Sequence, residues 1–431
     1  MSPPPQERYA SGLALLRDLS KRRGAPAGVH LQVADRCNHA CQHCYQVQGQ
    51  KGELSLDEVR RVLDDLADAG VLTLNVSGGE ATLRDDLLDI LRHARARGFA
   101  TRLYTNAFLV DDAMADALAA IGLYEVHVSV YSAAAQEHDV VTRVPGSWER
   151  TVKGVRALRA RGVRVVLKCP ATEASSEGAP GVERLAEALD CSFRAAASMT
   201  PREDGALEPL AVAASPEHLV ATGLLRPWRP PLHHEALRRE LLAEGSCGVG
   251  RSGVVVLPDG TVQPCSDTPL RVGNVLTDGF RAVLAAEVFE LLRGLTRADV
   301  HGCRDCDLMA ACHRCHATAL HEGGDYLGPY PTACAHARAR YAAAVGAVEL
   351  LDPAAGCARD RDRRVGPFRV EGDGKLRPIP DVCTAEDEAR AERHPWLRRA
   401  VGAEKTPTVL PVNHLIRGRR RAEETPKRER L

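Results

Sequence analysis

Apolar and polar residues alternate along residues 29–194 in a pattern that predicts short buried strands separated by amphipathic helices. The expected strands span residues 30–34, 72–77, 101–104, 125–130, 163–168 and 192–196. Strand–helix alternation at this spacing is typical of parallel strands joined by crossover helices. The pattern therefore predicts an α/β fold, as an open or closed barrel or as a doubly wound sheet.

The clearest helix signal is the stretch "SLDEVRRVLDDLADAG". Ser55 can cap the helix, Glu58 stands three residues later, and Gly70 ends the apolar periodicity. The same reasoning predicts helices over residues 84–97, 111–121 and 148–161.

After about residue 201 the periodicity loosens, and the chain divides into further regions. Pro258, Asp259 and Gly260 predict a β-hairpin turn, and helices are expected over 234–245 and 332–351. Charge runs and prolines predict that much of 352–431 is poorly ordered. We expect an N-terminal extension (1–28), a barrel (29–235), a small cysteine-rich domain (236–350) and a charged tail (351–431).

Composition excludes several function classes. Lys plus Arg (57) equals Asp plus Glu (57), so no global charge draws the chain to nucleic acid or to acidic membranes. No apolar run is long enough to span a bilayer, and the N-terminus lacks the order of a secretion signal. A cytoplasmic location is the expectation, with neither nucleic acid nor membrane as a partner.

Fourteen cysteines in such a chain do not indicate disulfides, because a reducing compartment keeps thiols free for metal binding or catalysis. Ten of them fall into two groups. Cys169, Cys191, Cys357 and Cys383 stand alone, and each is expected to be an inert or buried thiol, although Cys169 ends a predicted strand and could face a cavity.

The first group is Cys37, Cys41 and Cys44, in "DRCNHACQHCY". A structural zinc site takes four protein ligands, whereas three thiolates on a four-iron cluster leave one iron free to bind something else. The loop follows the first predicted strand, which places it at the mouth where a parallel barrel gathers catalytic loops. The stretch "VSGGEATLR" follows the second strand, with Gly78 and Gly79 permitting close approach of a ligand and Glu80 able to accept from an ammonium group.

Seven further cysteines lie between residues 247 and 334 and predict a metal-stabilised region, with structural zinc as the alternative to iron. They are Cys247, Cys265, Cys303, Cys306, Cys312, Cys315 and Cys334.

The CxxxCxxC loop and the Gly-Gly-Glu stretch together resemble the radical S-adenosylmethionine (SAM) superfamily. The resemblance implies a partial (β/α)6 barrel and a [4Fe–4S] cluster held by Cys37, Cys41 and Cys44 as the catalytic centre. It also implies that one electron cleaves SAM to methionine and a 5′-deoxyadenosyl radical, which abstracts hydrogen from a substrate. Gly79 and Glu80 would contact the methionine amino group of SAM, and Gly78 would belong to the same SAM-binding stretch. Asn106, Ser129 and Arg143 are further candidates for binding SAM, with a turn or a surface ion pair as the alternatives for Asn106 and Arg143.

The second cysteine set resembles the SPASM extension, which carries auxiliary iron–sulfur clusters. The resemblance implies two such clusters, expected to be [4Fe–4S]: a distal one on Cys303, Cys306, Cys312 and Cys334, and a proximal one on Cys247, Cys265 and Cys315. The proximal set lacks a fourth cysteine. We expect an open iron there, or a ligand from His233, His234 or Glu244.

The resemblance favours a ribosomally made peptide as substrate, with a crosslink or an oxidised side chain as product. A separate leader-binding protein and a ferredoxin or flavodoxin are the partners it implies. One alternative is a tetrapyrrole-precursor enzyme such as an oxidative decarboxylase of porphyrin propionates. A more remote one is a non-catalytic metal scaffold or electron carrier, which has no use for the Gly-Gly-Glu stretch.

Overall fold

The structure is a computed structural model, which describes residues 25–174, 178–229, 234–251, 253–300, 302–304, 306–346, 368–370 and 376–378. Most of the predicted N-terminal extension and charged tail lie outside the described residues. Within the tail, β10 (Phe368–Val370) and β11 (Leu376–Pro378) pair antiparallel. None of the described helices is long and apolar enough to cross a membrane.

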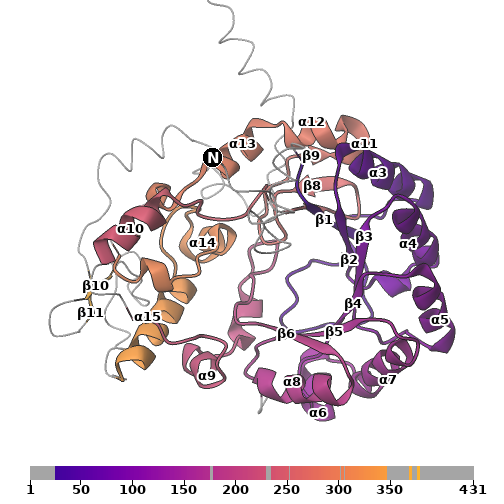
Figure 1. Cartoon of the computed structure of the whole chain (residues 1–431), viewed down its shortest axis with the longest axis horizontal. Helices are drawn as coiled ribbons and strands as arrows, with labels where there is room; N and C mark the ends of the chain where they lie inside the picture. Colours follow the sequence, from indigo (N-terminus) through magenta and orange to yellow (C-terminus); the bar gives the residue numbers. More distant parts are fainter. Residues whose placement is uncertain are drawn as a thin grey trace, which may run out of the picture.

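All six predicted strands form, and they pair in parallel in the order in which they occur along the chain. Within the described residues they belong to one nine-stranded sheet, ordered β6-β5-β4-β3-β2-β1-β7-β8-β9. The barrel strands are β1 (Gly28–Ala34), β2 (Thr73–Gly78), β3 (Ala100–Thr105), β4 (Glu125–Ser129), β5 (Val165–Pro170) and β6 (Ser192–Ala196). The predicted parallel α/β architecture is confirmed as an open barrel (Figure 1).

Helices cover the outer face of these strands, as Figure 1 shows. They are α3 (Leu56–Ala69), α4 (Leu87–Ala96), α5 (Asp112–Ile121), α6 (Ala135–Thr142), α7 (Ser147–Ala160) and α8 (Gly178–Ala188). Helix α3 begins with the predicted capping box of Ser55 and Glu58 and ends at Gly70 in the left-handed conformation. Helix α6 was not predicted: it is short, and Val140 within it is exposed, so it shows no clear apolar face.

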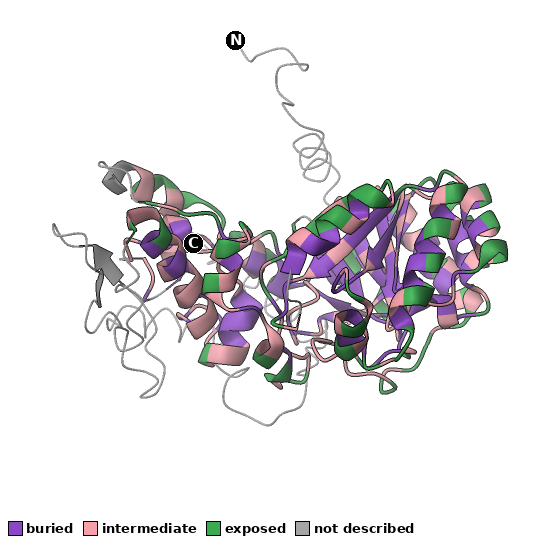
Figure 2. Cartoon of the chain, turned by 90° about the horizontal axis from the view of Figure 1, so that it is seen from below, coloured by how far each residue is buried: buried purple, intermediate pink, exposed green. Residues whose placement is uncertain are grey.

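The main hydrophobic core lies between the sheet and these helices, and it appears as the buried layer in Figure 2. Alternate strand residues such as Val165, Leu167 and Cys169 belong to this core. Because successive side chains of a strand point to opposite faces, the residues between them, such as Lys168, face the barrel interior. Cys169 is therefore a buried core thiol, as expected from the sequence.

The predicted hairpin forms, but it does not stand apart from the barrel. Strand β7 (Gly253–Val256) pairs in parallel with β1, so β7, β8 (Thr261–Gln263) and β9 (Gly273–Asn274) extend the barrel sheet beyond its first strand. This pairing satisfies the backbone groups along the edge of β1 that would otherwise be exposed.

Further helices follow strand β6 and strand β9 along the chain. They are α9 (Pro216–Ala221), α10 (His234–Ala243), α11 (Val275–Asp278), α12 (Phe280–Leu284), α13 (Glu287–Gly294), α14 (His316–Gly323) and α15 (Pro331–Val345). Helices α10 and α15 correspond to the two predicted here. Single turns of 3-10 helix complete the architecture at η1 (Ala81–Leu83), η2 (Glu208–Val212), η3 (Arg297–Asp299) and η4 (Met309–Ala311).

Candidate active site and cysteine cavities

A cavity of about 210 Å³ lies at the carboxyl ends of the barrel strands, and most of the predicted site residues line it. These are Cys37, Cys41, Cys44, Gly78, Gly79, Glu80, Asn106 and Ser129. Parallel strands end at a common edge of the sheet, which explains how residues spread over the first third of the chain meet.

Backbone hydrogen bonds hold the three-cysteine loop over this edge. The N–H groups of Ala40 and Gln42 donate to the carbonyls of Thr142 (3.1 Å) and Val141 (3.0 Å) at the end of α6. On the other side, Glu80 N donates to the Arg36 carbonyl at 2.9 Å. The loop is thus fixed between the second strand and a helix that the sequence pattern did not reveal.

Gly78 and Gly79 are required by this close approach. A Cβ added to Gly79 would lie 2.3 Å from the Arg36 carbonyl oxygen, and one added to Gly78 would lie 2.4 Å from the Ala34 carbonyl oxygen. Both contacts are with backbone atoms, which cannot move aside cheaply. The glycines therefore allow the cysteine loop to rest directly on the end of β2.

We expect Gly79→Ala to displace the loop that carries Cys37 by several tenths of an ångström or more. Misplacement on that scale can lower turnover by about 100-fold, and the rate of SAM cleavage measures it. Gly294→Ala is the matched control, because a Cβ there meets nothing within 4 Å. Equal rates for Gly79→Ala and the wild type would contradict the steric role.

Glu80 is a buried carboxylate whose hydrogen bonds join two strand ends. Its Oε1 accepts from Thr82 N (3.0 Å), Thr82 Oγ1 (2.7 Å) and Thr105 Oγ1 (2.6 Å), and its Oε2 accepts from Asn106 N at 2.7 Å. The carboxylate thereby positions Asn106, whose side chain donates to Asn38 of the cysteine loop at 2.7 Å.

The three thiols are costly to ionise in this setting. Burial raises the pKa of Cys37 to about 11 and that of Cys41 to about 12, and it also raises the pKa of Cys44. Neighbouring thiols add to the effect, because one thiolate disfavours the next. A cationic iron centre among the three would reverse this penalty.

Aromatic rings wall the cavity. His43 lies edge-on to Tyr131 with ring centroids 4.7 Å apart, and burial lowers its pKa to about 4, so it is neutral. His39 lies against Phe108 at 5.3 Å. The only signal for Tyr131 was its place two residues after Ser129.

Several polar atoms at this cavity are buried and have no hydrogen-bond partner among the described residues. In the cavity lining they are both ring nitrogens of His39 and Nδ1 of His43, and Nδ2 of Asn38 is a further one in the same loop. Buried polar groups are nearly always satisfied, so unsatisfied ones at a cavity point to a ligand. Together with the glycine cradle and the three thiols, these atoms fit a polar ligand such as SAM.

Arg143 does not join the group. It follows α6 in the left-handed conformation, with a φ of 57°, and its side chain is exposed. Its assignment to SAM stays a prediction, and the structure places the side chain outside the cavity lining.

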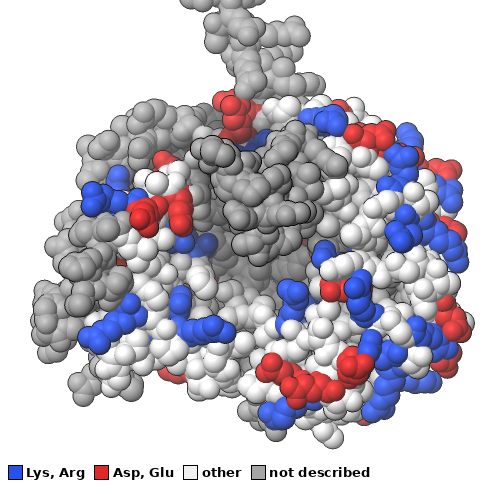
Figure 3. All heavy atoms as spheres, viewed as in Figure 1, with Lys and Arg blue, Asp and Glu red and all other residues white. Residues whose placement is uncertain are grey.

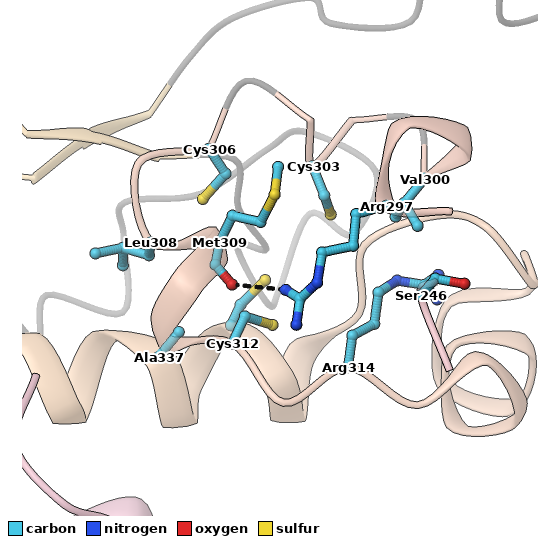
Figure 4. A pocket seen from close by; sticks show the side chains of 11 residues that line it. Ser246, Arg297, Val300, Cys303, Cys306, Leu308, Met309, Cys312, Arg314 and Ala337 are labelled. Carbon is cyan, nitrogen blue, oxygen red and sulfur yellow. Dashed lines mark hydrogen bonds between the residues drawn. The ribbon is translucent and has the colours of Figure 1, made fainter. Parts of the chain in front are cut away.

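The second cysteine set separates into two groups, in the interleaved manner implied by the resemblance. Cys303, Cys306, Cys312 and Cys334 line one cavity of about 50 Å³ (Figure 4). Arg297 and Arg314 also line it, and Arg297 donates to the Met309 carbonyl at 3.0 Å, as the dashed line in Figure 4 shows. Burial raises the pKa of Cys312, while these guanidinium groups and Arg340 oppose the shift.

Cys247, Cys265 and Cys315 form the other group. Burial is the main cause of the raised pKa of Cys265, to which the charges of Asp267, Cys315 and Cys247 add. Burial raises the pKa of the Tyr326 hydroxyl, and the charges of all three thiols raise it further. Chain segments that are 68 residues apart in sequence thus meet at one place in the fold.

Two protein-family models match this chain, one over the three-cysteine loop and one over most of the second cysteine set. The Radical SAM superfamily matches residues 31–170, and the iron-sulfur cluster-binding SPASM domain matches residues 247–316. This chain is a radical SAM protein with a SPASM domain. The two domains imply iron–sulfur clusters and SAM binding.

Relatives of this radical SAM protein include enzymes with different named substrates. The AdoMet-dependent heme synthase of Methanosarcina barkeri is 26% identical over 336 residues, which is 71% of this chain and 96% of the relative. The PqqA peptide cyclase of Ruegeria pomeroyi is 26% identical over 322 residues, covering 69% and 84%. The crystal structure of Streptococcus suis SuiB bound to precursor peptide SuiA shares the fold, with a TM-score of 0.54 and 15% identity over 72% of this chain and 77% of SuiB.

The arrangement of the cysteines bears on the zinc alternative for the SPASM region. Among the described residues, no three His, Cys, Asp or Glu side chains are grouped as they would be around a single metal ion. A cluster of four irons holds its thiolates farther apart than one zinc ion does. The match of residues 247–316 to an iron-sulfur cluster-binding domain favours iron–sulfur clusters over zinc for this region.

Polar side chains from the barrel strands, His30, Ser77 and Tyr104, also line the cavity that holds the three cysteines. His30 Nε2 and Ser77 Oγ are 2.5 Å apart, and Tyr104 lies between the rings of His30 (5.7 Å) and His127 (4.6 Å). Burial lowers the pKa of His30 to about 4, so this histidine is neutral. None of these residues was predicted from the sequence, because alternation in a strand does not show which polar positions share one interior.

Proposed function

We propose that this radical SAM protein reductively cleaves SAM and abstracts a hydrogen atom from a substrate that bears a carboxylate. The observation that carries the chemistry is the single cavity that gathers Cys37, Cys41 and Cys44 with Gly78–Glu80. In this proposal the three thiolates hold the cluster and leave one iron for SAM. When bound, that cluster supplies the electron that converts SAM to methionine and a 5′-deoxyadenosyl radical.

The chain's own residues would orient SAM. The backbone at Gly78 and Gly79 leaves room for the methionine group, and the carboxylate of Glu80 fixes the Asn106 end of β3. His43 and Tyr131 offer ring surface for adenine, and Ser129 offers a hydroxyl group. Their burial excludes water from a radical that would otherwise be quenched.

The substrate is expected to enter through the open side of the barrel. Strand β6 is the edge strand, and its residues Ser192, Arg194 and Ala196 are exposed. Figure 3 shows the molecule hollowed at its centre, with basic side chains around the hollow. An opening of this kind can admit an extended segment of polypeptide.

Two cations on the inner face support a substrate that bears a carboxylate. Lys168 on β5 is the register partner of both Ser129 on β4 and Arg194 on β6. Neither Lys168 nor Arg194 makes an ion pair or a side-chain hydrogen bond within the described residues, whereas Arg102 in the same interior pairs with Glu125 at 3.2 Å. Burial and the charge of Arg194 lower the pKa of Lys168. A substrate carboxylate beside Lys168 would offset both the burial and the repulsion from Arg194, and so favour the charged ammonium.

We assign the substrate as a ribosomally made peptide whose acidic side chain or carboxyl terminus meets these cations. The similarity to PqqA peptide cyclases and the shared fold with SuiB support this assignment. The product would carry a crosslink or an oxidised side chain. A separate leader-binding protein, a ferredoxin or flavodoxin as electron donor, and a cytoplasmic location belong to the same proposal.

A second candidate is oxidative decarboxylation of a tetrapyrrole precursor. The match to heme synthases covers 96% of one relative and 90% of another, which favours this candidate. Propionate groups of a porphyrin would meet the same two cations.

The test begins with protein reconstituted without oxygen and given SAM and dithionite. Formation of 5′-deoxyadenosine would establish the radical chemistry. Short peptides encoded beside the gene, and coproporphyrin III, are then added separately and followed by mass spectrometry. A peptide that loses hydrogen supports the first assignment, and a porphyrin that loses carbon dioxide supports the second. Zinc instead of iron, with no SAM cleavage, would overturn the proposal.

Replacing the cations should weaken substrate binding and spare SAM. Lys168→Met and Arg194→Gln are each expected to raise the KM of the substrate by about 10- to 100-fold, because charged hydrogen bonds contribute about 1.5–3 kcal/mol. Substrate-free formation of 5′-deoxyadenosine should stay within about twofold of the wild type. Lys153→Met, on the exposed face of α7, is the control. Loss of substrate-free SAM cleavage would show instead that the cations bind the carboxylate of SAM.

A further inference from the structure

The proximal cysteine group has three thiols, and the ligands considered from sequence do not complete it. Residue 233 and the side chain of residue 234 lie outside the described residues, and the Glu244 side chain is exposed. The structure instead places a different carboxylate beside the group.

That carboxylate is Asp267, which follows Cys265 by two residues. Its Oδ2 lies 3.9 Å from Cys315 Sγ, and its Oδ1 accepts from Ser266 Oγ at 2.9 Å. Asp267 therefore lies two residues from one thiol of the group and 3.9 Å from another, although Cys265 and Cys315 come from distant parts of the chain.

No Lys or Arg pairs with Asp267 within the described residues. A carboxylate 3.9 Å from a thiol that must ionise to bind iron is unfavourable unless a cation stands between them. Iron accepts carboxylate as well as thiolate ligands. The unfavourable arrangement becomes favourable once iron occupies the space between the four side chains.

We propose that Asp267 is the fourth protein ligand of an iron–sulfur cluster held by Cys247, Cys265 and Cys315. The proposal rests on the iron–sulfur part of the proposed function and is independent of the substrate. It replaces the open iron expected from sequence with an iron that carries one oxygen ligand. A carboxylate ligand exchanges more readily than a thiolate. Asp267 would therefore bind this iron in the absence of another ligand and could be displaced by one.

The test uses the full-length reconstituted protein with saturating SAM, which occupies the free iron of the first cluster. Labelled cyanide is then added, and pulsed EPR of the reduced protein reports whether the label couples to an auxiliary cluster. We expect no coupling in the wild type, and coupling in Asp267→Ala. Asp267→Cys, which restores four thiolates, should again exclude cyanide while shifting the midpoint potential. Glu287→Ala, which removes an exposed carboxylate in the first turn of α13, is the matched control and should behave as the wild type.

Two results would overturn the proposal in distinguishable ways. The first result is that cyanide couples equally in the wild type and in Asp267→Ala, or in neither protein. Asp267 would then not be the ligand, although the clusters themselves would be present. Absence of every cluster signal, with zinc in the protein, would overturn the iron–sulfur function and this ligand assignment with it.

Discussion

Cys37→Ala is expected to reduce 5′-deoxyadenosine formation to background, because the first cluster would then have two thiolates. Three full cubanes correspond to about twelve irons per chain, and the variant should retain about eight. The structure adds a reason beyond ligand count: Cys37 lies in contact range of Gly79, whose added Cβ would be 3.1 Å from the Cys37 Cβ. The thiol is therefore placed by the same close approach that shapes the proposed SAM site.

The matched control is Cys191→Ala, which removes a lone thiol packed against the core. It should keep its iron and its SAM cleavage. If Cys37→Ala still cleaved SAM at a measurable fraction of the wild-type rate, the assignment of the three-cysteine loop as the catalytic centre would be wrong.

Lys51→Met is expected to destabilise the fold by about 3–5 kcal/mol, which is the usual cost of removing one partner from a buried ion pair. The Lys51 ammonium is 4% exposed and donates to Glu203 Oε1 (2.5 Å), Asp35 Oδ1 (3.3 Å) and the Val47 carbonyl (2.7 Å). It ties the segment after the third cysteine to the loop after β6. Without it, two poorly solvated carboxylates would lose their cation. Denaturant unfolding of the reconstituted protein measures the change.

Lys153→Met makes the same replacement on an exposed helix face and should change stability by less than about 0.5 kcal/mol. The double variant Lys51→Met, Glu203→Gln should recover part of the loss, because it removes one of the stranded charges. A loss below about 1 kcal/mol for Lys51→Met alone would contradict the view that this network is insulated from water.

Sequence alone predicted the strand–helix alternation, the parallel strands and the division of most cysteines into two groups. Those features depend on local periodicity and on spacing along the chain, which are visible without coordinates. The six strands formed where apolar runs predicted them, and the capping box of Ser55 and Glu58 started α3 as expected.

Only the tertiary structure decided which distant residues share a space. Pairing of β7 with β1 joins the second cysteine region to the barrel, and strand register sets Lys168 beside Arg194. Asp267 meets Cys315 across 48 residues, and nothing in the local pattern of either residue indicates the other. The physical reason is that sequence periodicity reports which face of an element is buried, whereas the partners on that face are chosen by packing between elements far apart in the chain.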